Sequence, residues 1–307
     1  MKSRVALGIA IPQIFQDEPV GPDGIRNFLL RAESLGYESG WVQEQILGSA
    51  KTYEPIELLT FAAACTTRLR LGAAVLLTAL RSPVHTAKSL ATLDHLSQGR
   101  LIVGVGLGAA QKLYPAFGMT AMRRAARFTE GLKLMIRLWT EPQVTFDGEF
   151  YKLDHAAMEP KPIQKPHPPL WFGAHHPDAL KRAVDLGQGF MGAGSSPTPV
   201  FKDEVSVVRK LLEAARRDPT SFPIGKRVYI AVDRDKGRAG RRLTEWFAAY
   251  YRRGEMAEQV SVWGSAEECA EGLRAIIAAG AQSLLLNPVF DHAEHLEQLA
   301  SDVAPRL

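Results

Sequence analysis

Cysteine is scarce in this chain of 307 residues, which contains only Cys65 and Cys269. The two are far apart and each falls within an apolar helical pattern, so we expect reduced core thiols and no disulfide framework or metal site. Long apolar runs are also missing, because no segment approaches the ~20 residues that span a bilayer. The apolar run near the start of the chain stops at Pro12, too early for a signal peptide. These absences predict a cytoplasmic protein with no membrane partner.

Concentrated positive charge is missing too. The chain has 37 basic and 33 acidic residues, a formal net charge of +4, and the basic residues are scattered among acids. Pairs such as Arg241 and Arg242 lie in helical patterns, where a solvated helix face is the simplest interpretation. Because no basic run is interleaved with aromatic residues, we expect no nucleic-acid partner. A weaker interpretation is that some arginines attract an anionic cofactor tail.

Short β-type runs alternate along the chain with longer helical patterns. Ile25, Leu29, Ala32 and Leu35 form one helical stripe, which Gly36 ends. Eight strands separated by helices predict an α/β fold, a (β/α)8 TIM barrel formed by one domain over residues 1–307. An open doubly wound sheet is the alternative, because a strand count does not prove closure. The strands are predicted at 5–11, 39–43, 69–77, 101–107, 170–173, 189–193, 227–232 and 283–286.

Two insertions interrupt this alternation, at about 140–169 and 233–281. The first contains a predicted hairpin with Asp147 and Gly148 at its turn, followed by a proline-rich extended connector. The second contains at least two helical patterns.

Three glycines follow one another at every second position of the fourth predicted strand: Gly104, Gly106 and Gly108. This spacing removes side chains from one face of the strand only. Such a face allows another backbone or a flat ligand to come close. The pattern therefore favours a parallel α/β enzyme that binds a large planar cofactor.

The segment 81–108, RSPVHTAKSLATLDHLSQGRLIVGVGLG, closely resembles the signature of the bacterial luciferase-like flavin-dependent oxidoreductases, and above all the branch that uses the deazaflavin coenzyme F420. The resemblance extends over most of residues 4–195. It implies a barrel with the cofactor ring at the carboxyl ends of the strands, and a homodimer. Further agreement lies at Arg124, Glu130, Leu138-Trp139-Thr140, Phe146-Asp147-Gly148, Pro160-Lys161-Pro162 and Pro168-Pro169-Leu170-Trp171-Phe172-Gly173.

Two loops after the fifth and sixth predicted strands are candidates for binding the cofactor's phosphate. Residues 173–178 enter a helix with Pro177 in its first turn, where free backbone N–H groups bind anions. Residues 192–196 are small and leave backbone donors open. The alternative is that both are ordinary connecting loops. The residues expected to bind the cofactor here are Gly106, Gly108, Gly173, Ala174, His175, Gly192, Ala193, Gly194 and Ser195.

The resemblance implies a backbone bulge behind the cofactor ring at the end of the third strand, often with a non-proline cis peptide. It assigns Thr78 and Ala79 to the back of the ring. Gln13, after the first strand, is a further cofactor-binding candidate.

Glu44 is the candidate for carrying a proton. In the family an acidic residue followed by histidine often faces the ring, and here Glu44 is followed by Gln45. Glutamine does not exchange protons near neutral pH, so the histidine role is lost. Burial would raise the pKa of Glu44 and suit it to proton transfer, although a structural cap or ion pair is the alternative.

Several other polar residues favour structural roles. Asp94 and His95 resemble a catalytic dyad, but they end a barrel helix and are expected to fix the turn that follows. His175 and His176 do not predict a metal site, because adjacent residues point in different directions and no metal-ligand spacing accompanies them. Ala109 stands where the family frequently has tryptophan, which opens the pocket.

The leading hypothesis is an oxidoreductase that transfers a hydride between coenzyme F420 and a small organic substrate, with the barrel orienting the cofactor and excluding water. One alternative is an FMN-dependent monooxygenase that takes reduced flavin from a partner reductase. A second is a flavin-binding protein without catalysis, suggested by the missing histidine. A metal-dependent hydrolase is the most distant alternative.

Overall fold

The computed structural model describes residues 5–16, 18–108 and 111–307. Ala109, which the sequence places at the opening of the pocket, lies outside the described residues. No helix in the described part of the chain is long and apolar enough to cross a membrane.

Eight parallel strands close into a barrel, which confirms the predicted (β/α)8 architecture and excludes the open sheet. Each strand pairs with its neighbours in chain order, and the last returns to the first with Ala6 opposite Ser283. The strands are β1 (Ala6–Ala10), β3 (Ser39–Val42), β5 (Arg70–Ala73), β6 (Leu101–Val105), β9 (Leu170–Phe172), β10 (Gly189–Gly192), β11 (Ile224–Val232) and β13 (Ser283–Asn287).

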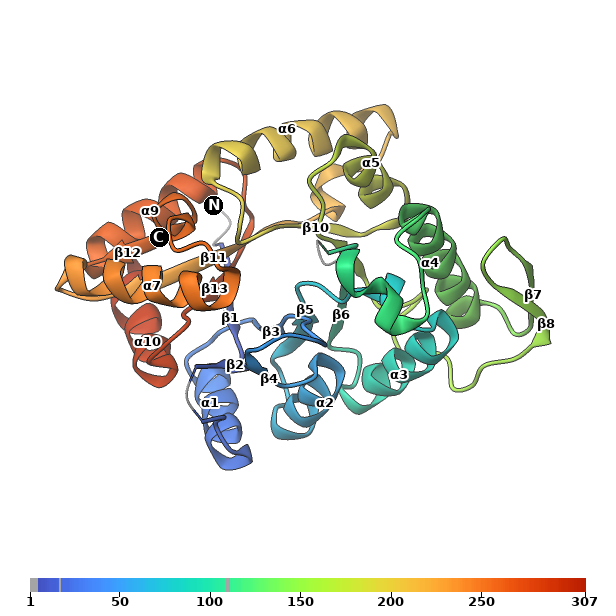
Figure 1. Cartoon of the computed structure of the whole chain (residues 1–307), viewed down its shortest axis with the longest axis horizontal. Coiled ribbons are helices and arrows are strands. Elements are labelled where there is room, and N and C mark those ends of the chain that lie inside the picture. The colour runs from blue at the N-terminus through green and yellow to red at the C-terminus, as the bar shows by residue number, and fades with distance from the viewer. Residues whose placement is uncertain (1–4, 17, 109–110) are drawn as a thin grey trace.

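Helices surround the barrel, as Figure 1 shows. Proline occupies the first turn of α1, α2, α3, α5 and α6, where its missing N–H costs nothing. Glu54 and Ser82 cap α2 and α3 with their side-chain oxygens. The helices are α1 (Pro22–Ser34), α2 (Pro55–Cys65), α3 (Pro83–Leu96), α4 (Arg124–Thr140), α5 (Pro177–Leu186), α6 (Thr198–Ala214), α7 (Lys236–Tyr251), α8 (Met256–Val260), α9 (Ala266–Ala278) and α10 (His292–Gln298).

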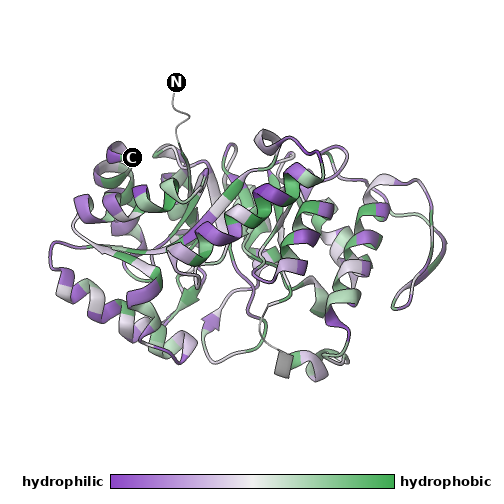
Figure 2. Ribbon diagram, turned by 90° about the horizontal axis from the view of Figure 1, so that it is seen from above, coloured by the Kyte–Doolittle hydropathy of each residue, from purple (hydrophilic) through white to green (hydrophobic). Residues whose placement is uncertain are grey.

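Two hydrophobic layers hold the barrel together. Inside it, five buried side chains from different strands form one cluster: Trp41, Ile102, Trp171, Met191 and Leu285. Outside it, the strands and helices enclose the larger core, and Figure 2 shows apolar residues gathered on the strands and on helix sides that face them. The inner cluster fills the barrel, so the open space for a ligand lies at its mouth.

Both insertions contain the predicted elements. The antiparallel hairpin β7 (Val144–Asp147) and β8 (Lys152–Ala156) projects beside α4 in Figure 1, where the Glu130 carboxylate accepts from the N–H groups of Glu149, Phe150 and Tyr151. The second insertion supplies α7, α8 and β12 (Ser261–Gly264), which pairs with the far end of β11. It thereby carries the end of α7 to the barrel mouth.

Asp94 and His95 are scaffold residues, as expected. The buried Asp94 carboxylate accepts from the Gln164 backbone N–H at 2.9 Å and from its side-chain Nε2 at 2.7 Å. His95 Nε2 lies 2.7 Å from the Lys161 carbonyl oxygen. Both residues therefore fasten the proline-rich connector to the end of α3.

The glycines of β6 make room for the protein's own chain. A Cβ at Gly104 would lie 1.6 Å from the Ala73 carbonyl oxygen, and one at Gly106 would lie 2.6 Å from Val75 Cγ2. The close approach that the sequence predicts is therefore an approach of β5 at Gly104. The ligand-facing part of the pattern is confined to Gly106 and Gly108, which line the cavity described below.

Replacing Gly104 by alanine is expected to lower the free energy of unfolding by at least about 3 kcal/mol, because overpacking here meets backbone that has no room to move. Urea unfolding followed by circular dichroism measures the change. Gly21→Ala is the control, since nothing lies within 4 Å of a Cβ at that position. Equal effects of the two substitutions would contradict this account of the β5–β6 contact.

Candidate active site

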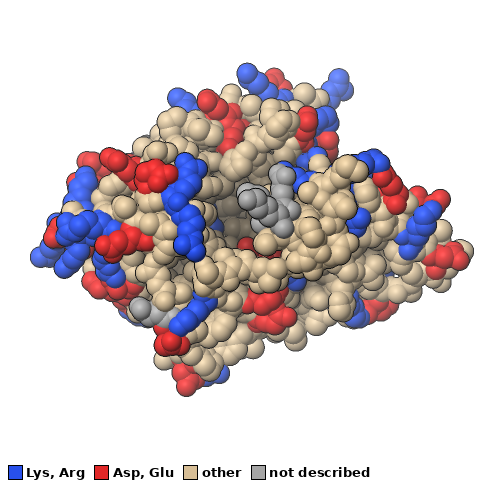
Figure 3. Space-filling view, in the orientation of Figure 1, with Lys and Arg blue, Asp and Glu red and all other residues tan. Residues whose placement is uncertain are grey.

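A cavity of about 550 Å³ lies at the carboxyl ends of the barrel strands, within the size range of small-molecule sites. Figure 3 shows the surface hollowed near the middle of the molecule. The cavity brings together most of the residues selected from the sequence, namely Glu44, Gly106, Gly108, Gly173, Ala174, His175, Gly192, Ala193, Gly194 and Ser195.

Three of the selected residues do not line this cavity. Strand β5 ends at Ala73, and the non-proline cis peptide joins Ala74 to Val75, so the chain presents Ala74, Val75 and Leu77 to the cavity. Thr78 and Ala79 follow in a buried 3-10 turn, which corrects the expected position of the bulge by three to four residues.

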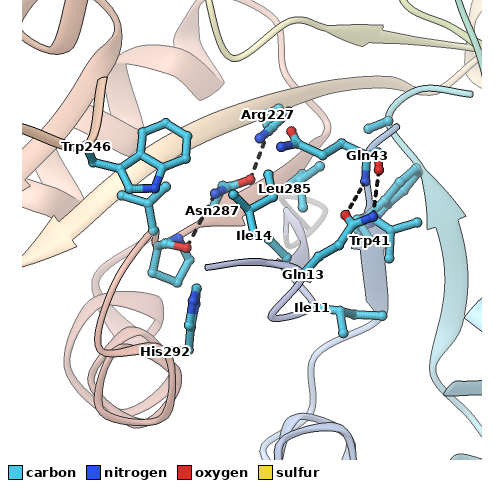
Figure 4. A pocket seen from close by; sticks show the side chains of 15 residues that line it. Ile11, Gln13, Ile14, Trp41, Gln43, Arg227, Trp246, Leu285, Asn287 and His292 are labelled. Atoms are coloured by element: carbon cyan, nitrogen blue, oxygen red, sulfur yellow. Dashed lines mark hydrogen bonds between the residues drawn. The ribbon is translucent and has the colours of Figure 1, made fainter. Parts of the chain in front are cut away.

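Gln13 is the third selected residue that does not line this cavity. Its side-chain amide is bonded to the backbone of two other segments at the barrel mouth. Its Nε2 donates to the carbonyl oxygens of Gln43 and Tyr53, each at 2.7 Å, and its Oε1 accepts from the Gln43 N–H at 2.8 Å. Figure 4 shows the Gln13–Gln43 pair in a smaller adjacent pocket.

The two loops proposed for phosphate binding face the same cavity. The N–H groups of Ala174, His175 and His176 precede α5, and those of Gly194 and Ser195 follow β10. No described residue accepts a hydrogen bond from any of these five groups. Five unpaired backbone donors on one cavity wall make a site for an anion.

Buried charges hold these loops in place. Glu204, 5% exposed, places Oε1 2.6 Å from His175 Nδ1, and Ser196 Oγ lies 3.2 Å from the same nitrogen. Lys226 Nζ donates to the carbonyl oxygens of Ala193 and, at 2.7 Å, of Ser196. Burial lowers the pKa of Lys226 to about 8. Lys226 thus binds two carbonyl oxygens of the loop after β10, while the N–H groups of Gly194 and Ser195 have no acceptor among the described residues.

Glu44 belongs to a buried ion-pair network on the opposite side of the barrel. One carboxylate oxygen of Glu44 accepts a hydrogen bond from Arg81 Nε at 2.7 Å, and the other accepts one from the Leu77 N–H. Arg81 also forms an ion pair with Glu54. Burial raises the pKa of Glu44, while the charge of Arg81 opposes that rise. Glu44 therefore lines the cavity and is also part of a structural ion pair, and its role as a proton carrier stays a prediction.

The cavity wall carries more positive than negative charge. Arg124, Arg182 and Arg227 line it, whereas Glu44 is the one carboxylate among its described lining residues and is already paired with Arg81. Among the residues that the structure describes, no group of three histidine, cysteine or acidic side chains is arranged to hold a metal ion.

Sequence reasoning missed five polar residues of the cavity wall, and it named Arg124 only as part of the family resemblance. The five are Gln43, Arg182, Arg227, Tyr250 and Tyr251. A basic residue at the start of the seventh predicted strand was a usable signal for Arg227, because the barrel strands hold only two other charged residues, Arg70 of β5 and Lys226 of β11. Nothing in the sequence indicates that the end of α7, inside an insertion, reaches the barrel mouth.

Comparison with known proteins agrees with this geometry. A family model described as luciferase-like monooxygenase matches residues 5–259. The chain belongs to this family. Two curated relatives, both F420-dependent glucose-6-phosphate dehydrogenases, match along nearly the whole chain. The protein from Kineococcus radiotolerans is 29% identical over 94% of each chain, and that from Intrasporangium calvum is 27% identical over 94% of this chain and 96% of its own.

Solved structures of other proteins have the same fold. A monooxygenase from Streptomyces bottropensis superposes with a TM-score of 0.84 at 25% identity, covering 98% of this chain and 99% of that protein. An F420-dependent secondary alcohol dehydrogenase, solved with an F420–acetone adduct, gives a TM-score of 0.85 at 20% identity, covering 99% of both chains. At that identity the second likeness shows the fold alone.

A histidine that lines the smaller pocket, His292, predicts that the folded protein loses stability in acid. Burial lowers the pKa of His292 to about 4, helped by the charge of His295. The unfolded chain therefore binds a proton that the folded protein excludes, and stability is expected to fall as pH drops from about 6.5 to 4, by roughly 3 kcal/mol in all. Urea unfolding at pH 7.5 and pH 4.5 measures this loss.

His292→Leu is expected to reduce that loss, since His292 Nδ1 is buried without a partner in the described chain. His85→Leu, at an exposed position of α3, is the control and keeps the wild-type pH dependence. An unchanged pH dependence in His292→Leu would contradict the assignment.

Proposed function

We propose that this protein transfers a hydride between coenzyme F420 and a small organic substrate. One observation carries the proposal: two loops with unpaired backbone N–H groups face one cavity whose wall is otherwise cationic. The names of the full-length curated relatives support the choice of coenzyme. The predicted single domain, homodimer and cytoplasmic location remain parts of this proposal.

The cavity fits such a cofactor in both size and chemistry. Val75 stands between Gly106 and Gly173, since a Cβ at either glycine would come within 3 Å of its methyl groups. This packing fixes Val75 as an apolar surface on the cavity wall, suited to the face of a flat ring. The amide groups of 174–176 and 194–195 are suited to the anionic part of the coenzyme.

When bound, the deazaflavin supplies the hydride chemistry, and the protein supplies binding, orientation and the exclusion of water. Ala174, His175, Gly194 and Ser195 would hold the phosphate. Ala74, Val75 and Leu77 would support the ring. Glu44 would hold or release a proton at its carboxylate, because its pKa is raised by burial and it lines the cavity.

An FMN-dependent monooxygenase is the second candidate, and the similar Streptomyces monooxygenase structure favours it. Both cofactors carry a phosphate, so the amide loops suit either. This candidate would need reduced FMN from a partner reductase. The candidate without catalysis predicts cofactor binding and no turnover.

Equilibrium titration separates the two cofactors. Purified protein is titrated with F420 and, separately, with FMN, and binding is followed by fluorescence. We expect F420 to bind at least about tenfold more tightly, because its longer anionic tail meets the cationic wall. Tighter binding of FMN, together with oxygen consumption in the presence of reduced FMN, would overturn the proposal.

The role of Glu44 is tested by Glu44→Gln. We expect kcat to fall about 10²- to 10⁴-fold with little change in F420 affinity, because proton transfer is lost while the phosphate loops stay intact. Glu54→Gln is the control, since it removes the outer partner of Arg81 and keeps the Glu44 carboxyl group. If both variants lose activity equally, Glu44 acts only through the ion-pair network.

A further inference from the structure

Arg227 is a buried cation at the barrel mouth with no acidic partner. It is 8% exposed, and its Nε donates to Asn287 Oδ1 at 2.9 Å. No carboxylate of the described chain lies within ion-pair distance of it, and neither terminal nitrogen of the guanidinium donates to a described residue. A buried charge without a counter-ion is strongly destabilising. The terminal nitrogens of the guanidinium are therefore available to an anion from outside the chain.

The guanidinium points toward the space where a substrate would bind. Arg227 stands opposite Leu285 in the β11–β13 register, and Leu285 belongs to the cluster inside the barrel. Arg227 lines both the large cavity and the small pocket of Figure 4. The small pocket offers only about 30 Å³, room for little more than water, so a ligand of Arg227 occupies the large cavity.

Two tyrosine hydroxyls border the same space. Tyr250 and Tyr251 reach the cavity from the end of α7. Tyr250 Oη accepts a hydrogen bond from Gln43 Nε2 at 3.1 Å, which leaves its own proton to donate to a ligand. Burial raises the pKa of Tyr250 to about 12, so the hydroxyl stays protonated near neutral pH. Tyr251 Oη is held 2.6 Å from Tyr229 Oη, and the Arg227 guanidinium lies over the Tyr229 ring.

We propose that Arg227, with the hydroxyls of Tyr250 and Tyr251, binds an oxyanion of the substrate, so that the substrate is an organic acid or a phosphate ester. The planar guanidinium matches carboxylate and phosphate oxygens in pairs. This inference rests on the proposed function, because it assigns the substrate part of the same cavity.

The substrate, and not the cofactor, is the source of this anion. The amide groups that suit the cofactor's phosphate belong to loops on the rim, after β9 and β10. Arg227 instead points inward from β11, beside Gln43 at the end of β3. The stem of Arg227 passes beside the rim loop, since a Cβ at Gly194 would lie 3.3 Å from Arg227 Cγ and Cδ. The second experiment below therefore tests whether the guanidinium binds the substrate or the cofactor.

The first experiment uses the protein without cofactor, so it does not depend on the proposed function. Isothermal titration compares isobutyrate with its neutral analogue isobutyramide. We expect isobutyrate to bind and isobutyramide not to bind. Arg227→Met should weaken anion binding at least about tenfold, Arg227→Lys should weaken it less, and Tyr250→Phe should weaken it severalfold.

Arg241→Met is the matched control, because Arg241 is an exposed arginine on α7 away from the cavity. Circular dichroism confirms that each variant is folded, and Arg227→Lys and Tyr250→Phe serve where Arg227→Met does not fold. Unchanged anion binding in these variants would overturn the proposal.

The second experiment decides between substrate and cofactor. The F420 affinity of Arg227→Met should equal that of wild type. Each protein is then assayed with reduced F420 and, separately, with the two members of a matched pair of carbonyl compounds, such as a 2-oxo acid and the corresponding methyl ketone. We expect wild type to prefer the acid and the variant to lose that preference through a raised KM. A large loss of F420 affinity would assign Arg227 to the cofactor, and a wild-type preference for the neutral ketone would also overturn the proposal. Failure of F420 to bind any variant would overturn the proposed function and leave the first experiment valid.

Discussion

The contact between Ala73 and Gly104 is the constraint on which the rest of the site depends. No side chain fits on Gly104, since its Cβ would lie 1.6 Å from the Ala73 carbonyl oxygen. The chain after β5 then stays against β6, where the Leu76 N–H donates to the Gly104 carbonyl oxygen at 2.8 Å and the Gly106 N–H donates to that of Leu76 at 3.0 Å. Val75 is thereby fixed between Gly106 and Gly173. The apolar floor of the cavity is a product of this packing.

Charge divides the cavity around that floor into three regions. Buried Lys226 and Glu204 hold the amide loops at the rim. Glu44, tied to Arg81, occupies the side formed by β3 and β5. Arg227 and the tyrosines of α7 occupy the side formed by β11. Under the proposed function, these three regions would bind a phosphate, hold a proton and bind a substrate oxyanion, and so would position cofactor and substrate relative to each other.

The fold was largely predictable, because most barrel strands are short apolar runs and helices such as α1 have a clear apolar stripe. The predicted third strand extended to residue 77, four residues beyond the end of β5 at Ala73. The apolar pattern continues through that region because the segment still packs on β6, and periodicity alone does not reveal where the hydrogen-bonded ladder breaks. The two glycine-containing loops lie together at the carboxyl ends of the strands, as expected, since loops after parallel strands must gather at one end of a barrel.

Residues that act through tertiary contacts were less predictable. Gln13 has the polarity of a cofactor ligand, yet its amide is used up by the backbone of Gln43 and Tyr53. Thr78 lies five residues beyond the end of β5 at Ala73, in a buried 3-10 turn that does not line the cavity. Tyr250 and Tyr251 come from an insertion whose path the sequence does not specify. In each case the decisive fact is which neighbour the side chain meets, and that depends on the closed barrel.

The most direct test of this account is a crystal structure of the protein with bound F420. The account predicts the deazaflavin ring against Val75 and the phosphate within hydrogen-bond distance, about 3 Å, of amide groups in 174–176 and 194–195. A phosphate bound by Arg227, or a coenzyme bound outside this cavity, would contradict it.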